Sequence, residues 1–278
     1  HCSGPPINER AWSAHRTWYD PVSCFPGSHF FTFDPESNTI DDWGIALDRE
    51  GCRCLALDEK RRKLYAITFP RNHFVVYDIE TRTLTDLGRI GEINPQAVFL
   101  DRDNNAYTTD DYGYILRYRP DEGVLERLSA RLPIEGRHRR GWHNVLYDVI
   151  PALDWSCLYG CDWGYESHLF RYDPYDSPDG RVDDLGRPEL FPEGFRTDYG
   201  LEQSQLRGLV FGRDGRLYYT IGAGWKKGSP RLLARLDLET GKSELLCEID
   251  YEGRMGQHID SATCDFYGHL FFAEAGGA

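Results

Sequence analysis

The sequence predicts an all-β protein, and within that class a β-propeller of four-stranded blades, on three observations. Strand-favouring aromatic residues are abundant, with 17 Tyr and 14 Phe against a single Met, and such residues are enriched in β-strands. Two kinds of turn return along the chain in a fixed order, as in propellers, whose repeats span about 40 to 60 residues. No long segment carries the 3.6-residue apolar period of a helix.

The first kind of turn is a hairpin that follows an aromatic or apolar residue and usually begins with Asp. It is rich in Pro, Glu, Thr and Gly, which favour tight turns between antiparallel strands. It is found at residues 33–38, 77–81, 118–123, 172–174 and 236–241.

The second kind of turn pairs a polar turn with a following Leu-Tyr or its equivalent. It spans residues 58–65, 101–107, 154–159, 212–218 and 265–271. The aromatic residues that end or nearly end it, Tyr65, Tyr107, Tyr159, Tyr218 and Phe271, are separated by 42, 52, 59 and 53 residues. Alternation of the two turns gives four short strands per repeat.

A β-sandwich also uses many short strands, but it does not require the same turn chemistry to return in the same order. The chain opens near the third strand of one blade and closes after the second strand of another. We therefore expect one propeller domain over residues 1–278 with five to seven blades. Either the two half-blades close a ring of about five blades, or the chain is part of a longer protein.

Composition restricts the partners. A net charge of -13 argues against nucleic-acid binding. The sequence contains no stretch of eighteen apolar residues, so it predicts no membrane-spanning helix. Because the chain starts with His1 and stops just after a strand-like run, we expect processing or truncation and a secreted or periplasmic location. Eight cysteines permit disulfides without showing them. We expect a monomer.

The longest irregular segments, at residues 133–144, 175–205 and 222–230, are where a rigid scaffold would carry a site. Residues 137–144 hold three Arg, two His and a Trp in an acidic protein with only five Lys. Arginine forks match carboxylate or sulfate oxygens in pairs, and a Trp face can stack on a sugar ring. The alternative is a solvated loop whose arginines pair with nearby carboxylates. We expect an acidic carbohydrate to contact Arg137, Arg139, Arg140, Trp142 and Asn144.

In a propeller the first strand of each blade lines the central channel, so residues at the start of these strands converge. Register places Arg53, Gln96, His143, Asn144, Arg207 and residues 258–260 there, with Tyr147, Tyr199 and Tyr251 close by in sequence. Such a set suits β-elimination on a uronic acid, which needs a neutralised carboxylate, a base and an acid. We expect Arg207 to neutralise, His143 or His258 to act as base, and a Tyr or the other His to donate the proton. The alternative is that each His is a structural strand residue.

The Tyr-Asp-Pro hairpin at 172–174, the Leu-Glu-Thr-Gly hairpin at 238–241 and the turns at 101–105 and 212–218, together with the channel-side His and Arg, resemble the β-propeller polysaccharide lyases. Ulvan lyase and oligogalacturonate lyase are examples. The resemblance implies His and Tyr as acid and base with Arg on the uronate carboxylate. These roles carry over to His143, His258, Arg207, Tyr199 and Tyr251. Several such lyases are seven-bladed and longer than this chain.

A metal site is a further hypothesis. His258, Cys264 and His269 follow no standard zinc signature, but the last two lie across one predicted turn. The resembling lyases can hold a structural divalent metal, so zinc or calcium would be the expected ion. The alternative is that Cys264 is a core residue, since register puts it where other repeats have Leu57 and Leu100. Cys157 and Cys161 are interpreted as core residues or a disulfide.

Two other functions stay open at this point. One is a non-catalytic propeller that binds a glycan or a protein partner. The other is a metal-dependent enzyme of the lactonase or lyase kind that acts on small molecules. No Gly-x-Ser-x-Gly, His-Glu-x-x-His or phosphate-loop motif is present.

Overall fold

A computed structural model describes residues 26–93, 95–133, 144–163, 167–188, 190, 206–222, 231–251, 254–255 and 258–275. At residues 250, 251, 254, 255, 258, 260 and 275 it describes the backbone alone. Every helix or strand in these ranges is a β-strand, which confirms the predicted all-β class. None of the described residues forms a helix long and apolar enough to cross a membrane.

The chain divides into two compact units, one of residues 1–111 and 117–126 and the other of residues 112–116 and 127–278. The prediction of one propeller domain over residues 1–278 is not tested by this division and stays a prediction.

The first unit opens with a two-stranded sheet of β1 (Gly27–Asp34) and β2 (Thr39–Asp48). A four-stranded antiparallel sheet follows, with neighbours in chain order: β3 (Gly51–Asp58), β4 (Lys63–Phe69), β5 (His73–Asp78) and β6 (Thr83–Arg89). The next sheet has the same order, with β7 (Phe99–Leu100), β8 (Ala106–Thr109), β9 (Tyr114–Arg119) and β10 (Val124–Arg131). The division between the units falls within this sheet.

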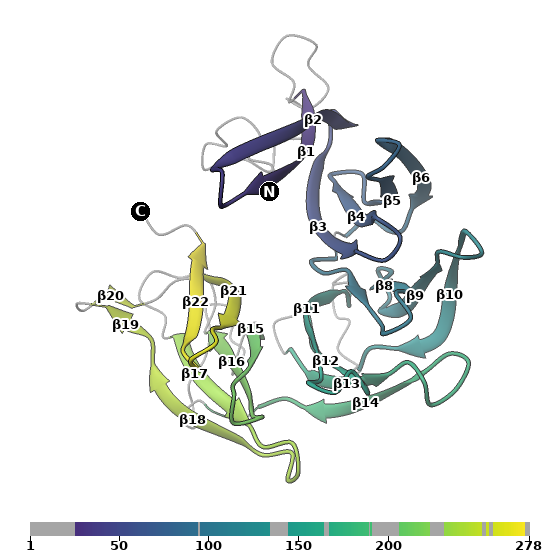
Figure 1. The fold of residues 1–278 in the computed structure, drawn as a ribbon. Coiled ribbons are helices and arrows are strands. Elements are labelled where there is room, and N and C mark those ends of the chain that lie inside the picture. Colours follow the sequence, from purple (N-terminus) through teal and green to yellow (C-terminus); the bar gives the residue numbers. More distant parts are fainter. Residues whose placement is uncertain are drawn as a thin grey trace. The chain divides into compact units, whose positions relative to one another are not determined.

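The second unit contains two more four-stranded sheets of this kind (Figure 1). The first consists of β11 (Leu146–Pro151), β12 (Leu158–Asp162), β13 (Leu169–Asp173) and β14 (Arg181–Gly186). The second consists of β15 (Leu206–Phe211), β16 (Leu217–Gly222), β17 (Arg231–Leu236) and β18 (Ser243–Glu248). Two hairpins complete the unit: β19 (Asp250–Tyr251) with β20 (Arg254–Met255), and β21 (His258–Cys264) with β22 (Leu270–Ala275).

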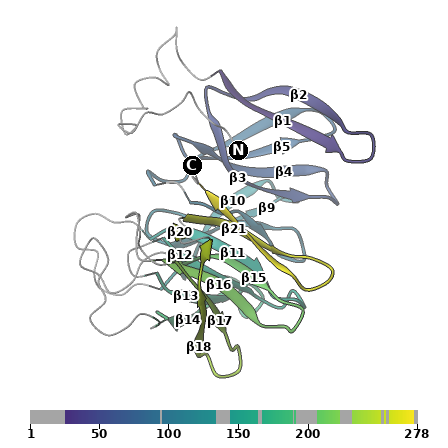
Figure 2. The ribbon, with the colours of Figure 1, turned by 90° about the vertical axis from the view of Figure 1, so that its left-hand side faces the viewer.

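These sheets are the predicted blades, and each four-stranded one is a meander of neighbouring strands (Figure 2). Both kinds of predicted turn lie where expected, the first between third and fourth strands and the second between first and second strands. One boundary was wrong: the irregular segment predicted over residues 175–205 contains β14. Its polar sequence hid the strand, because β14 is a partly exposed outer strand in which four of the six residues are polar or small.

Aspartate holds the turn between the first and second strands. Its carboxylate accepts a hydrogen bond from the hydroxyl of a tyrosine on the second strand in three sheets, as Tyr65 to Asp58, Tyr107 to Asp101 and Tyr218 to Asp214. In the β21–β22 hairpin His269 takes the place of the tyrosine, with its Nδ1 2.8 Å from Asp265. The repeated turn chemistry therefore has a repeated physical role.

A second recurring contact joins the third and fourth strands. A histidine ring at the start of the third strand bonds to an aspartate on the fourth, whose carboxylate also accepts the amide of a glycine two residues on. The three examples in the described part of the chain are His29–Asp42–Gly44, His73–Asp86–Gly88 and His168–Asp184–Gly186. The glycines have φ of 83°, 97° and 80°, a region that favours glycine. This contact identifies β1 and β2 as third and fourth strands of a blade.

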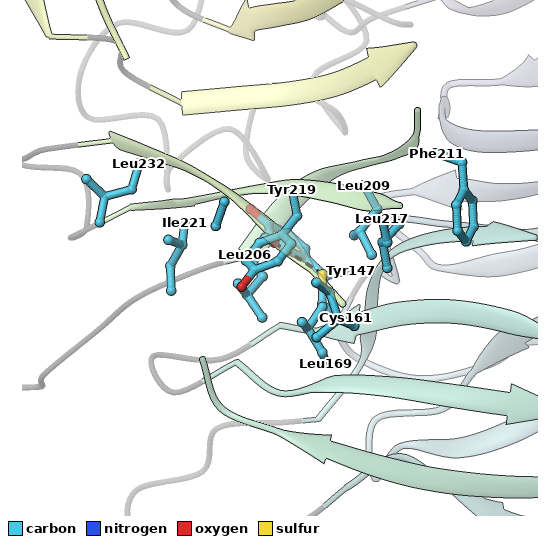
Figure 3. Close-up of a cluster of buried hydrophobic side chains, with 12 residues drawn as sticks. Tyr147, Cys161, Leu169, Leu206, Leu209, Phe211, Leu217, Tyr219, Ile221 and Leu232 are labelled. Atoms are coloured by element: carbon cyan, nitrogen blue, oxygen red, sulfur yellow. Dashed lines mark hydrogen bonds between the residues drawn. The ribbon is translucent and has the colours of Figure 1, made fainter. Parts of the chain in front are cut away.

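The apolar core of the second unit lies between sheets β11–β14 and β15–β18. Tyr147, Cys161, Leu169, Leu206 and Tyr219 are among its fully or almost fully buried members (Figure 3). Cys161 is therefore a core residue, and so is the buried Cys157. Both thiols are free, so the disulfide interpretation was wrong.

We expect Tyr107→Phe to lower the free energy of unfolding by about 1–3 kcal/mol, because a buried hydrogen bond to a carboxylate is lost. The Tyr107 side chain is 1% exposed and its hydroxyl lies 2.9 Å from Asp101. Urea unfolding measures the change. Tyr267→Phe is the control, since Tyr267 is 78% exposed in the β21–β22 turn. Equal stability of the Tyr107 variant and the parent protein would contradict the role given to the turn aspartates.

Candidate functional site

Arg207 is the one predicted catalytic residue whose side chain the structure describes. It lies on β15 and is 4% exposed. Its guanidinium carbon is 3.8 Å from the ring centroid of Tyr147 on β11, a favourable distance for a cation–π contact. Arg207 and Tyr147 thus meet from two first strands, as the convergence of these strands predicts. In the first unit, Arg53 on β3 likewise donates to Gln96.

The backbone of β15 is bulged directly after Arg207. The strand register shifts between Arg207 and Val210, and Gly208 has a φ of 64°, which favours glycine. The Asp148 carboxylate on β11 accepts the Leu209 amide at 3.0 Å. Burial raises the pKa of Asp148, while this amide and the charge of Arg207 oppose the rise. Asp148 therefore fixes the bulge that follows the site arginine.

A second buried arginine, Arg231, was missed by the sequence analysis. It begins β17, is 4% exposed and pairs with Gly222 of β16. A Cβ atom on Gly222 would stand 2.2 Å from the guanidinium carbon of Arg231. Only glycine at position 222 lets the Arg231 guanidinium lie against β16 in this way.

The two arginines affect each other electrostatically. Burial lowers the pKa of Arg231 to about 10; Tyr147 and the Glu274 carboxylate on β22 raise it, and the positive charge of Arg207 lowers it. Arg231 stays charged at neutral pH. Two buried like charges are costly unless negative groups compensate them, and the carboxylates of Asp148 and Glu274 supply negative charge at this place.

Asp162 is a second residue that the sequence analysis missed. It ends β12, is 8% exposed, and its carboxylate accepts the amide of His168 at 2.6 Å. Burial raises the pKa of Asp162 to about 7; the His168 amide and ring lower it, and the negative charge of Asp184 raises it. Alignment of the two repeats around Asn72-His73 and Ser167-His168 would have pointed to Asp162, because the corresponding place in β4 holds Thr68, whose hydroxyl accepts the His73 amide.

Asn144, predicted to bind substrate, is buried two residues before the start of β11. Its side-chain nitrogen donates to the carbonyl of Pro133 at 2.7 Å, and its side-chain oxygen is buried with no hydrogen-bond partner. A buried acceptor of this kind suits a ligand hydroxyl, so the substrate-binding role stays a prediction.

The remaining predicted residues are only partly described. His258 begins β21 and Tyr251 ends β19, and the structure describes only the backbone of both residues. Arg137, Arg139, Arg140, Trp142, His143 and Tyr199 lie outside the described residues. In chain order, residues 137–143 precede β11 and Tyr199 precedes β15. They belong to the connections that lead into the two strands carrying Tyr147 and Arg207.

The three predicted metal ligands do not meet. His258 and Cys264 occupy opposite ends of β21, and at a rise of about 3.3 Å per residue they are too far apart for one ion. The His269 ring bonds to Asp265 in its own turn. No group of three or more His, Cys, Asp or Glu among the described residues could hold a metal ion.

A separate cavity of about 540 Å³ lies in the first unit. Its lining comes mainly from β1 to β4 and is largely apolar, with Phe30, Phe31, Trp43, Leu55 and Leu57 among its residues. None of the predicted site residues lines it.

No protein-family model matches the chain, and no curated protein does. Solved structures match its fold. Hydrazine synthase of Kuenenia stuttgartiensis has a TM-score of 0.63 at 14% identity, covering 88% of this chain and 67% of that one. The extracellular domain of a one component system from B. thetaiotaomicron has a TM-score of 0.62 at 16% identity, and the match covers 89% of this chain and 30% of that one. Regucalcin, a calcium-binding protein from Agrobacterium tumefaciens, has a TM-score of 0.53 at 17% identity, and the match covers 81% of this chain and 68% of that one.

These likenesses confirm that the chain has a β-propeller fold. At such identities they show the fold alone, and the chain spans under a third of the B. thetaiotaomicron domain. The resemblance to polysaccharide lyases is supported as far as the propeller and no further.

We expect Asp162→Asn to remove a pH-dependent loss of stability. The pKa of Asp162 rises on folding from 3.8 to about 7, so the folded protein keeps a proton that the unfolded chain releases. This contribution is fully present below about pH 4 and is lost as the pH rises towards 7. As the pH rises from about 4 to 7, the parent protein should therefore lose stability relative to the Asn variant.

Urea unfolding at several pH values measures this difference. Asp103→Asn, at an exposed carboxylate, is the control and should follow the parent protein at every pH. If the curves of the Asp162 variant and the parent run parallel, the titration assigned to Asp162 is wrong.

Proposed function

We propose that the protein is a carbohydrate-active β-propeller that holds the carboxylate of a uronate-containing saccharide at Arg207 and Arg231. The observation that carries this proposal is the burial of two mutually influencing guanidinium groups beside the Tyr147 ring. Guanidinium forks match carboxylate oxygens in pairs, and charge pairing is stronger away from water. An acidic ligand would place a further negative charge beside the two guanidinium groups.

The chemistry proposed at this site is β-elimination. A base removes the proton on the carbon next to the carboxylate, and the electron pair forms a carbon–carbon double bond. The bond to the glycosidic oxygen breaks, and an acid protonates that oxygen. Arg207 would stabilise the charge that develops on the carboxylate.

The acid and base of this proposal come from four residues that lie in connecting segments or at the first or last position of a strand. His143 or His258 would serve as base, and the other histidine, Tyr199 or Tyr251 as acid. Their places in the chain support the assignment, because these segments lead into β11, β15 and β21. Arg137, Arg139, Arg140, Trp142 and Asn144 would bind neighbouring sugar units.

Replacing either site arginine with lysine should weaken binding of a galacturonate oligosaccharide by about tenfold or more, as expected from losing a charge-assisted hydrogen bond. Lysine keeps the charge but lacks the planar fork. Gly222→Ala should have a similar effect without removing any charge, since its Cβ displaces the Arg231 guanidinium. Isothermal titration calorimetry measures the affinities, with urea unfolding to confirm that each variant is folded.

Arg235→Gln is the matched control, because Arg235 lies on the same strand and its guanidinium binds Glu244 at 2.7 Å. It should bind like the parent protein. Unchanged affinity in both Lys variants would refute the arginine site.

Incubation with a panel of uronate polysaccharides should produce the ultraviolet absorbance of a conjugated unsaturated uronate, and His143→Ala should abolish it. The reason is that elimination, unlike hydrolysis, leaves a double bond next to the carboxylate. Binding without any absorbance change across the panel would overturn the lyase step and assign the same arginines to a non-catalytic glycan-binding propeller.

A further inference from the structure

The ends of β12 and β4 carry the same contact with different chemistry. In β4 the hydroxyl of Thr68 accepts the His73 amide at 3.0 Å, and in β12 the carboxylate of Asp162 accepts the His168 amide at 2.6 Å. In both sheets the histidine ring then bonds to an aspartate of the fourth strand. Only the β12 contact contains an acceptor that can gain or lose a proton.

The surroundings of Asp162 place its titration in the neutral range. His168, directly before β13, faces it with its amide and ring, and Asp184 on β14 adds a negative charge behind that ring. The preceding residue, Cys161, is a buried thiol whose own pKa is raised by burial and by nearby carboxylates. Burial raises the pKa of Asp162 to about 7. The ionised form of the Asp162 side chain is disfavoured at this buried position, whereas its protonated, neutral form is not.

Continuous contacts lead from Asp162 to the arginine site. The next residue, Trp163, donates its amide to the carbonyl of Val145 at 2.8 Å. The Trp163 ring stacks on Tyr147, with centroids 6.3 Å apart and planes at 21°. The same tyrosine ring also contacts the Arg207 guanidinium, whose carbon lies 3.8 Å from the ring centroid.

We propose that Asp162 is a proton-sensitive clamp between β12 and β13 that tunes, through Trp163 and Tyr147, how tightly Arg207 binds a carboxylate-bearing ligand. The proposal rests on the proposed function, because it takes the arginine pair as the ligand site. In the protonated state the neutral carboxyl fits its buried place and the aromatic stack is held. In the ionised state the buried charge beside Asp184 is unfavourable, so the end of β12 loosens and Trp163 shifts with it.

The clamp is tested first without ligand. The amide NMR signal of His168 and the indole N–H signal of Trp163 should titrate together in the parent protein with a midpoint near 7. In Asp162→Asn and Asp162→Thr, the second copying Thr68, the Trp163 signal should lose this titration. A His168 signal that does not move with pH, or that moves equally in the Asn variant, would overturn the clamp.

The coupling is tested with galacturonate oligosaccharide, whose carboxylates stay ionised from about pH 5.5 to 8.5. Parent-protein affinity should fall about fivefold or more over this range, the lower end of typical coupling between sites. Asp162→Asn should bind equally at all pH values. Trp163→Ala should keep the His168 titration yet lose the pH dependence of binding.

Failure of this proposal and failure of the proposed function give different results. Binding whose pH dependence persists in Asp162→Asn would overturn the coupling and leave the arginine site intact. If the His168 amide signal titrates as expected for the clamp but no binding is seen at any pH, the proposed ligand is overturned, and with it the coupling. The clamp itself would then be confirmed.

Discussion

The hydrogen bond from the Leu209 amide to the Asp148 carboxylate is the contact on which the site depends most. It ties the bulged backbone of β15 to β11. The bond gives the Leu209 amide an acceptor beside Gly208, whose positive φ departs from strand geometry. Because the bulge follows Arg207 directly, this one carboxylate sets where the arginine lies against Tyr147.

The rest of the scaffold uses the same few contacts repeatedly, and the candidate site lies where the repeats depart from them. Turn aspartates and histidine–aspartate contacts recur from sheet to sheet. At the start of β17, however, there is no histidine, and Arg231 lies there against Gly222. At the end of β12 an aspartate stands where β4 has Thr68. Repetition therefore stabilises the fold, and the exceptions supply charge.

The fold could be predicted because its turns are encoded locally. Asp, Pro, Gly and the tyrosine after each turn act within a few residues of one another, so a single sequence shows them. Arg207 was found by counting from those turns. Arg231 and Asp162 were missed because their properties come from burial and from partners on other strands, such as Gly222 and Asp184. His269 was suggested as a metal ligand because it lies across one turn from Cys264; in the structure its ring instead bonds to Asp265 in that turn.

Arg207 and Arg231 are the groups that we propose receive a ligand carboxylate. The most direct measurement is the NMR signal of each guanidinium Nε–H group during titration with a galacturonate oligosaccharide and, separately, with its neutral galactose counterpart. We expect both arginine signals to shift with the acidic sugar and neither to shift with the neutral one. Arginine signals that stay still while the acidic sugar binds would contradict the proposal.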